Sequence, residues 1–314
     1  MTTPLHDLVI KTIAEFLRCQ NNTLVRLMRI SVRFYRIRDF FFRQICLNVA
    51  NSTYAFVNDP YGWQIAHCFT LSKHDITDLS PCKNIRSVTL YDLHCIDDIS
   101  PLKNVFELRI DTCPYIRDVS SLGSVHDLVI DSCPYIRDVS SLGSVHNLSL
   151  REMKGIDDVS ALGNVHTLTL IYCPNISDVS SLGKVYSLLL DHCTRITDVS
   201  ALGTVHDLEL RHLSIKDVSA LGTVHTLRIF HCYDITDVSA LGRVKSLMLD
   251  CCFGTVDVSG LGTVSKLYIN YCRISSVAPL IGVKSLHLED CYDISDISSI
   301  QHLPNVKIIN CSSI

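Results

Sequence analysis

Two adjacent stretches of this chain are almost the same. Residues 113–132 read CPYIRDVSSLGSVHDLVIDS, and residues 133–152 read CPYIRDVSSLGSVHNLSLRE. The same frame extends in both directions, because aspartate recurs at the same place in almost every copy, at residues 78, 98, 118, 138, 158, 178, 198, 217, 237, 257 and 296. A fixed period of this length is typical of a solenoid, in which each repeat stacks on the next. The spacing predicts about twelve coils of 20 residues from residue 67 to the end of the chain.

The apolar residues of one copy predict the course of a single coil. Leu128 and Ile130 are two residues apart, as in a short strand that turns both side chains inward. The apolar steps after Cys133 are too irregular for a strand and too short for a helix, so we expect an arc of extended and 3-10 turns there. No single coil can bury these side chains alone, so the coils must stack on one another.

This pattern resembles the leucine-rich repeat. The L-x-x-L-x-L-x-x-C motif is present from Val125 to Cys133, with valine in the first place and cysteine where the family has asparagine or cysteine. The following I-x-D-V-S-x-L is similar to the convex side of the short repeat class. The resemblance covers about four fifths of the chain. It implies an α+β or β-solenoid class, with a parallel sheet on the concave face and a convex side of 3-10 and extended segments.

Two finer expectations concern the shape of the coil. A coil of 20 residues has no room for a convex helix, so we expect a rather flat, weakly curved solenoid. A glycine recurs where the chain turns back toward the strand, at residues 123, 143, 163, 183, 203, 222, 242 and 262. We expect these glycines to adopt a positive φ, which glycine does at little cost.

Three columns of reactive side chains run along the repeat. The cysteines lack the paired spacing of a metal or disulfide motif, so we expect buried thiols that pack as small hydrophobic groups. The aspartates would repel one another unless each accepts backbone hydrogen bonds, and calcium binding remains the alternative. A third column, just before the strands, holds histidines 126, 146, 166, 206 and 225 with Tyr186 and Lys245. Because tyrosine and lysine share this place, we expect a half-exposed ladder and no metal.

Composition and motifs narrow the function. The 314 residues carry a net charge of −4, and 47% of them are hydrophobic, as in a well-packed globular protein. No apolar run is long enough for a membrane span, and the first residues do not resemble a secretory signal. No catalytic triad, nucleotide loop or metal motif has the required spacing. We therefore expect no enzyme activity, no cofactor, no metal, no nucleic acid and no membrane partner.

The outward strand positions differ from copy to copy, whereas the framework positions barely change. In the middle and C-terminal coils they are rich in the aromatic and arginine side chains that anchor protein interfaces. The sequence therefore predicts a protein-binding face made by Ile171, Tyr172, Leu189, His192, Arg211, His212, Arg228, Phe230, His231, Tyr268 and Tyr271. The alternative is a surface of scattered residues with no partner.

The first 48 residues do not follow the repeat. Their apolar spacing predicts three short helices, followed by a linker over residues 49–66 and the solenoid over residues 67–314. The order of residues resembles the F-box pattern, which runs LPxEL…I…FL…DLLRL…VSRRFY. The matching residues are Pro4, Leu5, Leu8, Ile13, Phe16, Leu17, Leu24, Leu27, Val32 and Phe34. The resemblance implies that these side chains bind a Skp-family adaptor.

Together, the two resemblances imply an F-box/leucine-rich-repeat protein. Such proteins are substrate receptors of cullin-based ubiquitin ligases, in which the repeat face holds the protein to be modified. The alternative is a stand-alone scaffold or decoy whose N-terminal helices only cap the solenoid. The regular, recently duplicated array also resembles gene products of large DNA viruses of amoebae, which implies host–virus interaction. We expect a cytoplasmic or nuclear location, in the host cell if the protein is viral.

The end of the repeat predicts a further property. The last coil closes at Cys311-Ser312-Ser313-Ile314 without a polar cap. An uncovered sheet edge can pair with another chain. The sequence therefore predicts fraying or weak self-association through the C-terminal coil.

Overall fold

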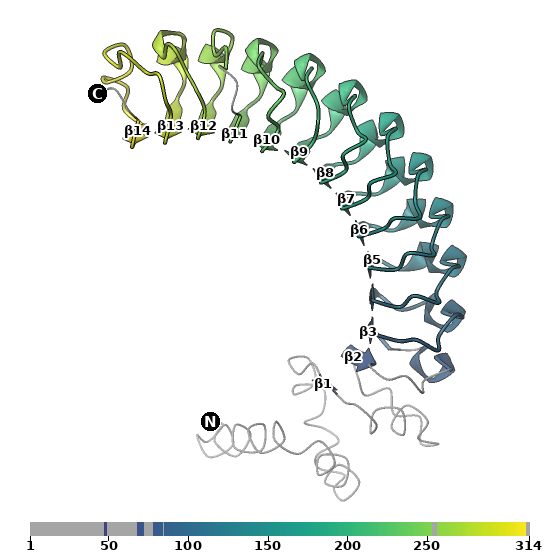
Figure 1. Ribbon diagram of the computed structural model, residues 1–314. Coiled ribbons are helices and arrows are strands. Elements are labelled where there is room, and N and C mark those ends of the chain that lie inside the picture. The colour runs from purple at the N-terminus through teal and green to yellow at the C-terminus, as the bar shows by residue number, and fades with distance from the viewer. Residues whose placement is uncertain (1–46, 49–67, 72–77, 84, 253–255, 312–314) are drawn as a thin grey trace, which may run out of the picture.

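A computed structural model describes residues 47–48, 68–71, 78–83, 85–252 and 256–311. These residues form a curved solenoid around one parallel sheet of 14 strands, whose spatial order is the order of the sequence (Figure 1). The strands are β1 (Leu47–Asn48), β2 (Cys68–Leu71), β3 (Ser87–Tyr91), β4 (Glu107–Asp111), β5 (Asp127–Asp131), β6 (Asn147–Arg151), β7 (Thr167–Ile171), β8 (Ser187–Asp191), β9 (Asp207–Arg211), β10 (Thr226–Phe230), β11 (Ser246–Asp250), β12 (Lys266–Asn270), β13 (Ser285–Glu289) and β14 (Val306–Ile309). The predicted coils are the successive connections from β2 to β14.

The convex side carries short 3-10 helices, as the sequence predicted. They are η1 (Ser80–Cys82), η2 (Ser100–Leu102), η3 (Ser120–Ser124), η4 (Ser140–Ser144), η5 (Ser160–Asn164), η6 (Ser180–Lys184), η7 (Ser200–Thr204), η8 (Ser219–Thr223), η9 (Ser239–Arg243), η10 (Leu261–Thr263) and η11 (Ala278–Gly282). The strands lie on the inner side of the arc and these helices on the outer side (Figure 1).

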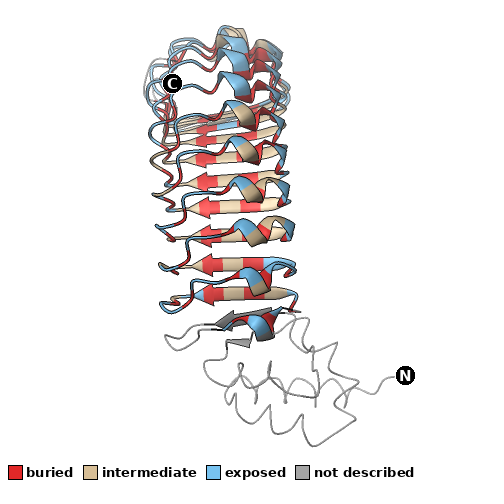
Figure 2. Ribbon diagram, turned by 90° about the vertical axis from the view of Figure 1, so that its right-hand side faces the viewer, coloured by how far each residue is buried: buried red, intermediate tan, exposed pale blue. Residues whose placement is uncertain are grey.

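A single hydrophobic core runs through the centre of the coils. In β8 the burial alternates strictly, with Leu188 and Leu190 inside and the other three residues facing out. Leu188 pairs in register with Leu168 of β7 and Leu208 of β9, so like residues stack on like residues. The red bands of buried residues therefore lie at the same places on successive strands in Figure 2. Repetition thus gives every coil the same core.

Each aspartate of the repeat shapes the turn before a 3-10 helix. The backbone N–H of Ser120 donates a hydrogen bond of 2.8 Å to Oδ1 of Asp118, and the same bond recurs along the array. This backbone hydrogen bond, together with the Ser120 side chain, holds the pKa of Asp118 below its usual range. The prediction that these carboxylates accept backbone hydrogen bonds is confirmed.

The glycines of the repeat do not have a positive φ, so that expectation is wrong. They lie within the 3-10 helices, where each helix packs against the helix of the next coil. A Cβ on Gly163 would overlap the backbone carbonyl oxygen of Ser181 in the following coil. Glycine is therefore required for close approach of the backbones.

The expectation of a flat solenoid is also wrong, because the molecule is a pronounced arc (Figure 1). Strands on the inner side lie about 4.8 Å apart. A 3-10 helix is wider than this spacing even where glycine allows backbone contact. The outer side of each coil therefore takes more room than the inner side, and the difference accumulates along the stack.

The cysteines of the column from Cys113 to Cys291 are buried directly after the strands, as predicted, and Cys311 in the last coil is half-buried. Cys193 has no exposed surface, and its Sγ lies 3.5 Å from the carbonyl oxygen of Asp191 and 3.6 Å from that of Leu170. Met153 and Leu213 take the same place in two other coils and are buried as well. Burial raises the pKa of the Cys133 thiol to about 12. These thiols fill the core of the coils.

The N-terminal predictions fall mostly outside the described residues. The F-box-like residues Pro4 to Phe34 and the linker are not described, so the three helices and the proposed boundaries stay predictions. Leu47–Asn48 is described, as strand β1, and pairs in parallel with β2. Within the described ranges, no helix has the length and apolar character needed to cross a bilayer.

Candidate functional site: the concave face

The predicted binding residues lie in three rows on the inner side of the arc. One row occupies the middle outward position of each strand and holds Leu189, Arg228 and Tyr268. A second row is the last strand position, with Ile171, Arg211 and Phe230. A third row follows each strand by one residue and holds Tyr172, His192, His212, His231 and Tyr271. None of these side chains is fully buried, so the structure leaves all of them accessible.

The third row has an unusual backbone. Its residues have a left-handed φ of about 50°, for example 52° at His192 and 50° at His212, although none of them is glycine. Each backbone N–H in this row donates to the next coil, as from His192 to the carbonyl oxygen of Arg211 at 3.2 Å. The repeat therefore imposes this conformation on whatever residue stands there, and the side chains form a continuous rim beside the sheet.

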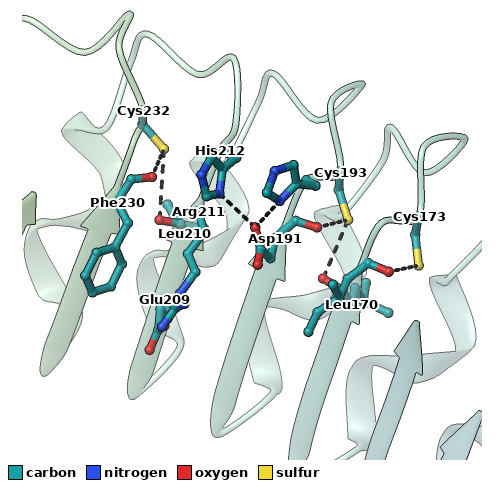
Figure 3. Close-up of polar contacts among 12 residues, drawn as sticks. Leu170, Cys173, Asp191, Cys193, Glu209, Leu210, Arg211, His212, Phe230 and Cys232 are labelled. Carbon is teal, nitrogen blue, oxygen red and sulfur yellow. Dashed lines mark hydrogen bonds and ion pairs between the residues drawn. The ribbon is translucent and has the colours of Figure 1, made fainter. Parts of the chain in front are cut away.

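An arginine cluster occupies the centre of the face. The Arg211 guanidinium forms an ion pair with Glu209 and lies over the Phe230 ring, 4.7 Å from its centroid (Figure 3). Arg228, from the next strand, lies 3.7 Å from the other carboxylate oxygen of Glu209. Glu209 is 16% exposed, whereas the two arginines are 41% and 45% exposed. One shielded carboxylate thus holds two accessible cations beside an aromatic ring.

A histidine cluster lies beside it. Nδ1 of His192 and Nδ1 of His212 lie 2.6 Å and 3.1 Å from the same oxygen of Asp191. The rings form a stack that runs Tyr172, His192, His212, His231, with centroids 4.2, 3.9 and 4.6 Å apart. Figure 3 shows the contact between the His212 imidazole and the Asp191 carboxylate as a dashed line.

Tyr268 and Tyr271 lie further along the arc, on and directly after strand β12. Tyr268 donates a hydrogen bond of 2.6 Å to Glu289, and its ring lies 4.5 Å from that of His287. Desolvation, followed by this hydrogen bond, raises the pKa of Tyr268. Tyr271 has a raised pKa because its side chain is hydrogen-bonded to Asp290. Strand β11 separates this group from the clusters around Asp191 and Glu209.

The histidine column before the strands is present as a ladder of stacked rings. It runs through Phe106, His126, His146, His166, Tyr186, His206 and His225, with neighbouring centroids 4.3 to 4.8 Å apart. The side chains are half-buried or exposed, which confirms the predicted half-exposed ladder. Because both faces of each inner ring are covered, the ladder stiffens this edge of the sheet.

Sequence reasoning chose the aromatic and basic residues but missed the carboxylates that organise them. Asp191 and Glu209 are not among the predicted site residues. The 20-residue period contains the missing signal, because Asp191 pairs in register with Arg211 and His192 precedes His212 by one full coil. Residues one period apart are neighbours, so each chosen residue points to its partners.

Comparisons with known proteins are limited to the fold. No family model matches the sequence, and no curated protein matches it either. The internalin InlF of Listeria monocytogenes is similar over 77% of this chain and 85% of its own length, with 20% identity and a TM-score of 0.49. The functional domain of InlJ from the same organism includes a cysteine ladder. It is similar over 79% of this chain and 70% of its own length, with 18% identity and a TM-score of 0.42.

A leucine-rich-repeat protein of Leptospira interrogans is similar over 76% of this chain and 83% of its own, with 13% identity and a TM-score of 0.39. Similarities this low do not transfer a partner or an activity. The fold is settled by the chain itself, through its 20-residue repeat, its parallel strands in sequence order and its convex 3-10 helices. It is a leucine-rich-repeat solenoid.

Proposed function

We propose that this chain is a protein-interaction module that binds its partner on the concave face between β7 and β13. The observation that carries the proposal is the cluster of Arg211, Arg228 and Phe230 around Glu209. Its cations are accessible and already oriented, so binding an acidic or aromatic partner surface costs little side-chain entropy. Arginine and aromatic side chains of this kind are typical of the centres of protein interfaces.

The test is a comparison of variants in quantitative affinity purification. Arg211→Glu combined with Phe230→Ala removes the centre of the cluster and leaves the core untouched. Arg137→Glu is the matched control, because Arg137 is exposed and lies after the cysteine of its coil, away from the strands. We expect the double variant to lose proteins that the control retains. Equal recovery of every associated protein with both variants would remove the proposal.

We further propose that the bound protein is a ubiquitination target and that this chain is its receptor in a cullin-based ligase. The support is the F-box-like order of residues between Pro4 and Phe34. In this role the chain performs no chemical step and is not an enzyme. It raises the effective concentration of the target near the ubiquitin carrier. The role places the protein in the cytoplasm or nucleus.

Co-expression of the full chain with a Skp-family adaptor tests this finer role. We expect the two proteins to copurify, and we expect Phe16→Ala together with Leu24→Ala to abolish copurification while Arg137→Glu has no effect. If the wild-type chain does not copurify with the adaptor, the alternative role of a stand-alone scaffold or decoy replaces the receptor role. That alternative predicts that removing residues 1–46 lowers stability but leaves binding on the concave face intact.

A further inference from the structure

We propose that Asp191, His192 and His212 form a binding site for a transition-metal ion, with Zn²⁺ as the ion that fits best. Within the described residues, the carboxylate and the two imidazoles offer ligand atoms that all lie within 4.8 Å of one another. The site departs from the expectation of no metal, which considered the cysteine and aspartate columns and the histidine column before the strands. It rests on these three side chains and does not depend on the proposed partner.

The two imidazoles point the same nitrogen at one point in space. Nδ1 of His192 and Nδ1 of His212 both approach Oδ1 of Asp191, at 2.6 Å and 3.1 Å. Around a four-coordinate Zn²⁺, ligand atoms about 2.0–2.2 Å from the metal lie about 3.3–3.5 Å from each other. A movement of the Asp191 carboxylate by about 0.7 Å away from His192 and about 0.2 Å away from His212 opens this space. The metal then takes the place of the hydrogen-bonding protons.

The rings are held in place before any ion arrives. Tyr172 covers the outer face of His192 at 4.2 Å, and His231 covers the outer face of His212 at 4.6 Å. The backbone of both histidines is fixed by hydrogen bonds to the next coil. Ligands that are locked by packing lose little freedom on binding, which favours a defined site over loose surface association.

Among the described residues, no arginine competes with a metal ion for the Asp191 carboxylate. Among the described residues, its ion pairs are with His192 and His212, whereas Arg211 of the neighbouring strand pairs with Glu209. Asp191 is 16% exposed and the histidines are 30% and 36% exposed, so an ion can enter from solvent. The thiol of Cys193 points to backbone carbonyls inside the coil and does not contribute.

Two nitrogens and one oxygen from the protein leave a fourth position for water or another ligand. Three-ligand zinc sites with one open position have this composition. Asp191 is an outward residue of the concave sheet (Figure 3), so the open position faces the interior of the arc. A histidine, cysteine or carboxylate of a bound protein can occupy it.

A second group in the same coils makes a useful contrast. His206, Asp207 and His225 also lie within 4.8 Å of one another, at the opposite end of the strands. There the contacts of the two rings differ, because Nδ1 of His206 lies 3.3 Å from Asp207 while Nδ1 of His225 is hydrogen-bonded to Thr226. His225 therefore serves as the internal control. It is half-buried and stacked like His212, but its Nδ1 is hydrogen-bonded to a hydroxyl group and not to a carboxylate.

The experiment is a titration of the tag-free full chain with Zn²⁺ by calorimetry, supported by the visible absorption of Co²⁺ in the same site. We expect one saturable equivalent and the spectrum of four-coordinate Co²⁺. Loss of a group that only orients a ligand weakens metal binding about 10–100-fold. His212 and Asp191 would bind the metal directly, so we expect His212→Ala and Asp191→Asn each to weaken binding at least about 100-fold. His225→Ala and His166→Ala are expected to leave the affinity unchanged.

Two outcomes overturn the proposal. One is the absence of saturable binding to the wild-type chain. The other is a loss of affinity in His225→Ala or His166→Ala as large as that in His212→Ala, which would show general binding to histidines. Asp191→Asn keeps the size of the side chain, and thermal unfolding of every variant shows whether a lost site reflects a lost fold. Neither outcome bears on the adaptor or the Arg211 cluster, which are tested separately.

Discussion

At the scale of single residues, the repeat assigns one physical task to each column. Cysteine and leucine fill the coil, and glycine allows close backbone contact. Aspartate closes the turn before most of the 3-10 helices, as Asp158 does by accepting the N–H of Ser160 at 2.8 Å. These tasks explain most of the chain without reference to function, so the outward residues are the ones that carry information about a partner.

The aspartate column makes stability depend on pH. The backbone hydrogen bond from Ser160 lowers the pKa of Asp158 below its unfolded value of 3.8. A folded-state pKa below the unfolded one adds stability that is complete above the unfolded value and is lost as the pH falls through the folded value. We therefore expect the free energy of unfolding to be level from neutral pH to about pH 5 and to fall steeply below about pH 4.

A matched pair of variants isolates this effect. Asp158→Asn retains an oxygen acceptor but removes the titrating group, so its unfolding free energy should fall less on acidification than that of the wild type. Asp157→Asn makes the same change of charge one residue away and should keep the wild-type pH dependence. Urea unfolding followed by circular dichroism between pH 7 and pH 2.5 measures both. If the unfolding free energies of the two variants fall equally as the pH is lowered, the pH dependence does not come from the hydrogen-bonded Asp158.

Cysteine reactivity follows burial within the described part of the chain. Cys95 is exposed, whereas Cys133 is fully buried and has its pKa raised to about 12 by desolvation. The thiolate is the reactive species, so the buried column should resist alkylation. We expect iodoacetamide at neutral pH to label Cys95 in the native protein and to label Cys133 only after urea is added, as read by peptide mass spectrometry. Rapid native labelling of Cys133 would show that the coil opens.

At the scale of elements, the strands and the 3-10 helices set different distances between neighbouring coils. The strands set the inner spacing through their hydrogen bonds, and the helices pack as closely as glycine permits. Glycine 163 in η5 meets the backbone of η6 with no side chain between them. Backbone cannot move aside as a flexible side chain can, so this contact controls the outer spacing.

Gly163→Ala is therefore expected to be costly. The added methyl group overlaps the carbonyl oxygen of Ser181, and overpacking of this kind costs about 1–3 kcal/mol. Asn164→Ala, at the exposed end of the same helix, is the control and should change stability by less than about 0.5 kcal/mol. Urea denaturation of both variants measures the difference, and a stable Gly163→Ala protein would mean that neighbouring coils can separate without loss.

Much of the fold could be predicted because the period is so regular. The alternation of Leu128 and Ile130 predicted the strand, and the cysteine and aspartate columns predicted their own roles. The curvature could not be predicted, because it depends on the relative widths of strand and helix. The left-handed rim also gave no signal, because its places are held by residues such as Tyr172 and His192 instead of glycine. Asp191 and Glu209 belong to no motif. They can be found only by asking which residues lie one repeat apart and are therefore neighbours on adjacent strands.

At the scale of the whole molecule, the sheet formed by the described residues has β14 as an edge strand. Strand β14 is the last strand of the order and pairs with β13 on one side. We expect the chain to self-associate weakly through this edge, so that the apparent mass rises with concentration in static light scattering. The association should be independent of the Arg211 cluster, and Arg211→Glu serves as the control. A constant monomer mass across the concentration range would contradict this prediction.

The left-handed rim gives the solenoid an unusual freedom. The strain of a positive φ is already built into every coil, whether the residue is Ser132, Glu152 or His212. Exchanging one side chain without a branch at Cβ for another changes the backbone cost little, so this row of residues can vary while the coil keeps its conformation. Substitutions in this row can therefore change which partner is bound, one coil at a time, while the coils beneath keep their fold.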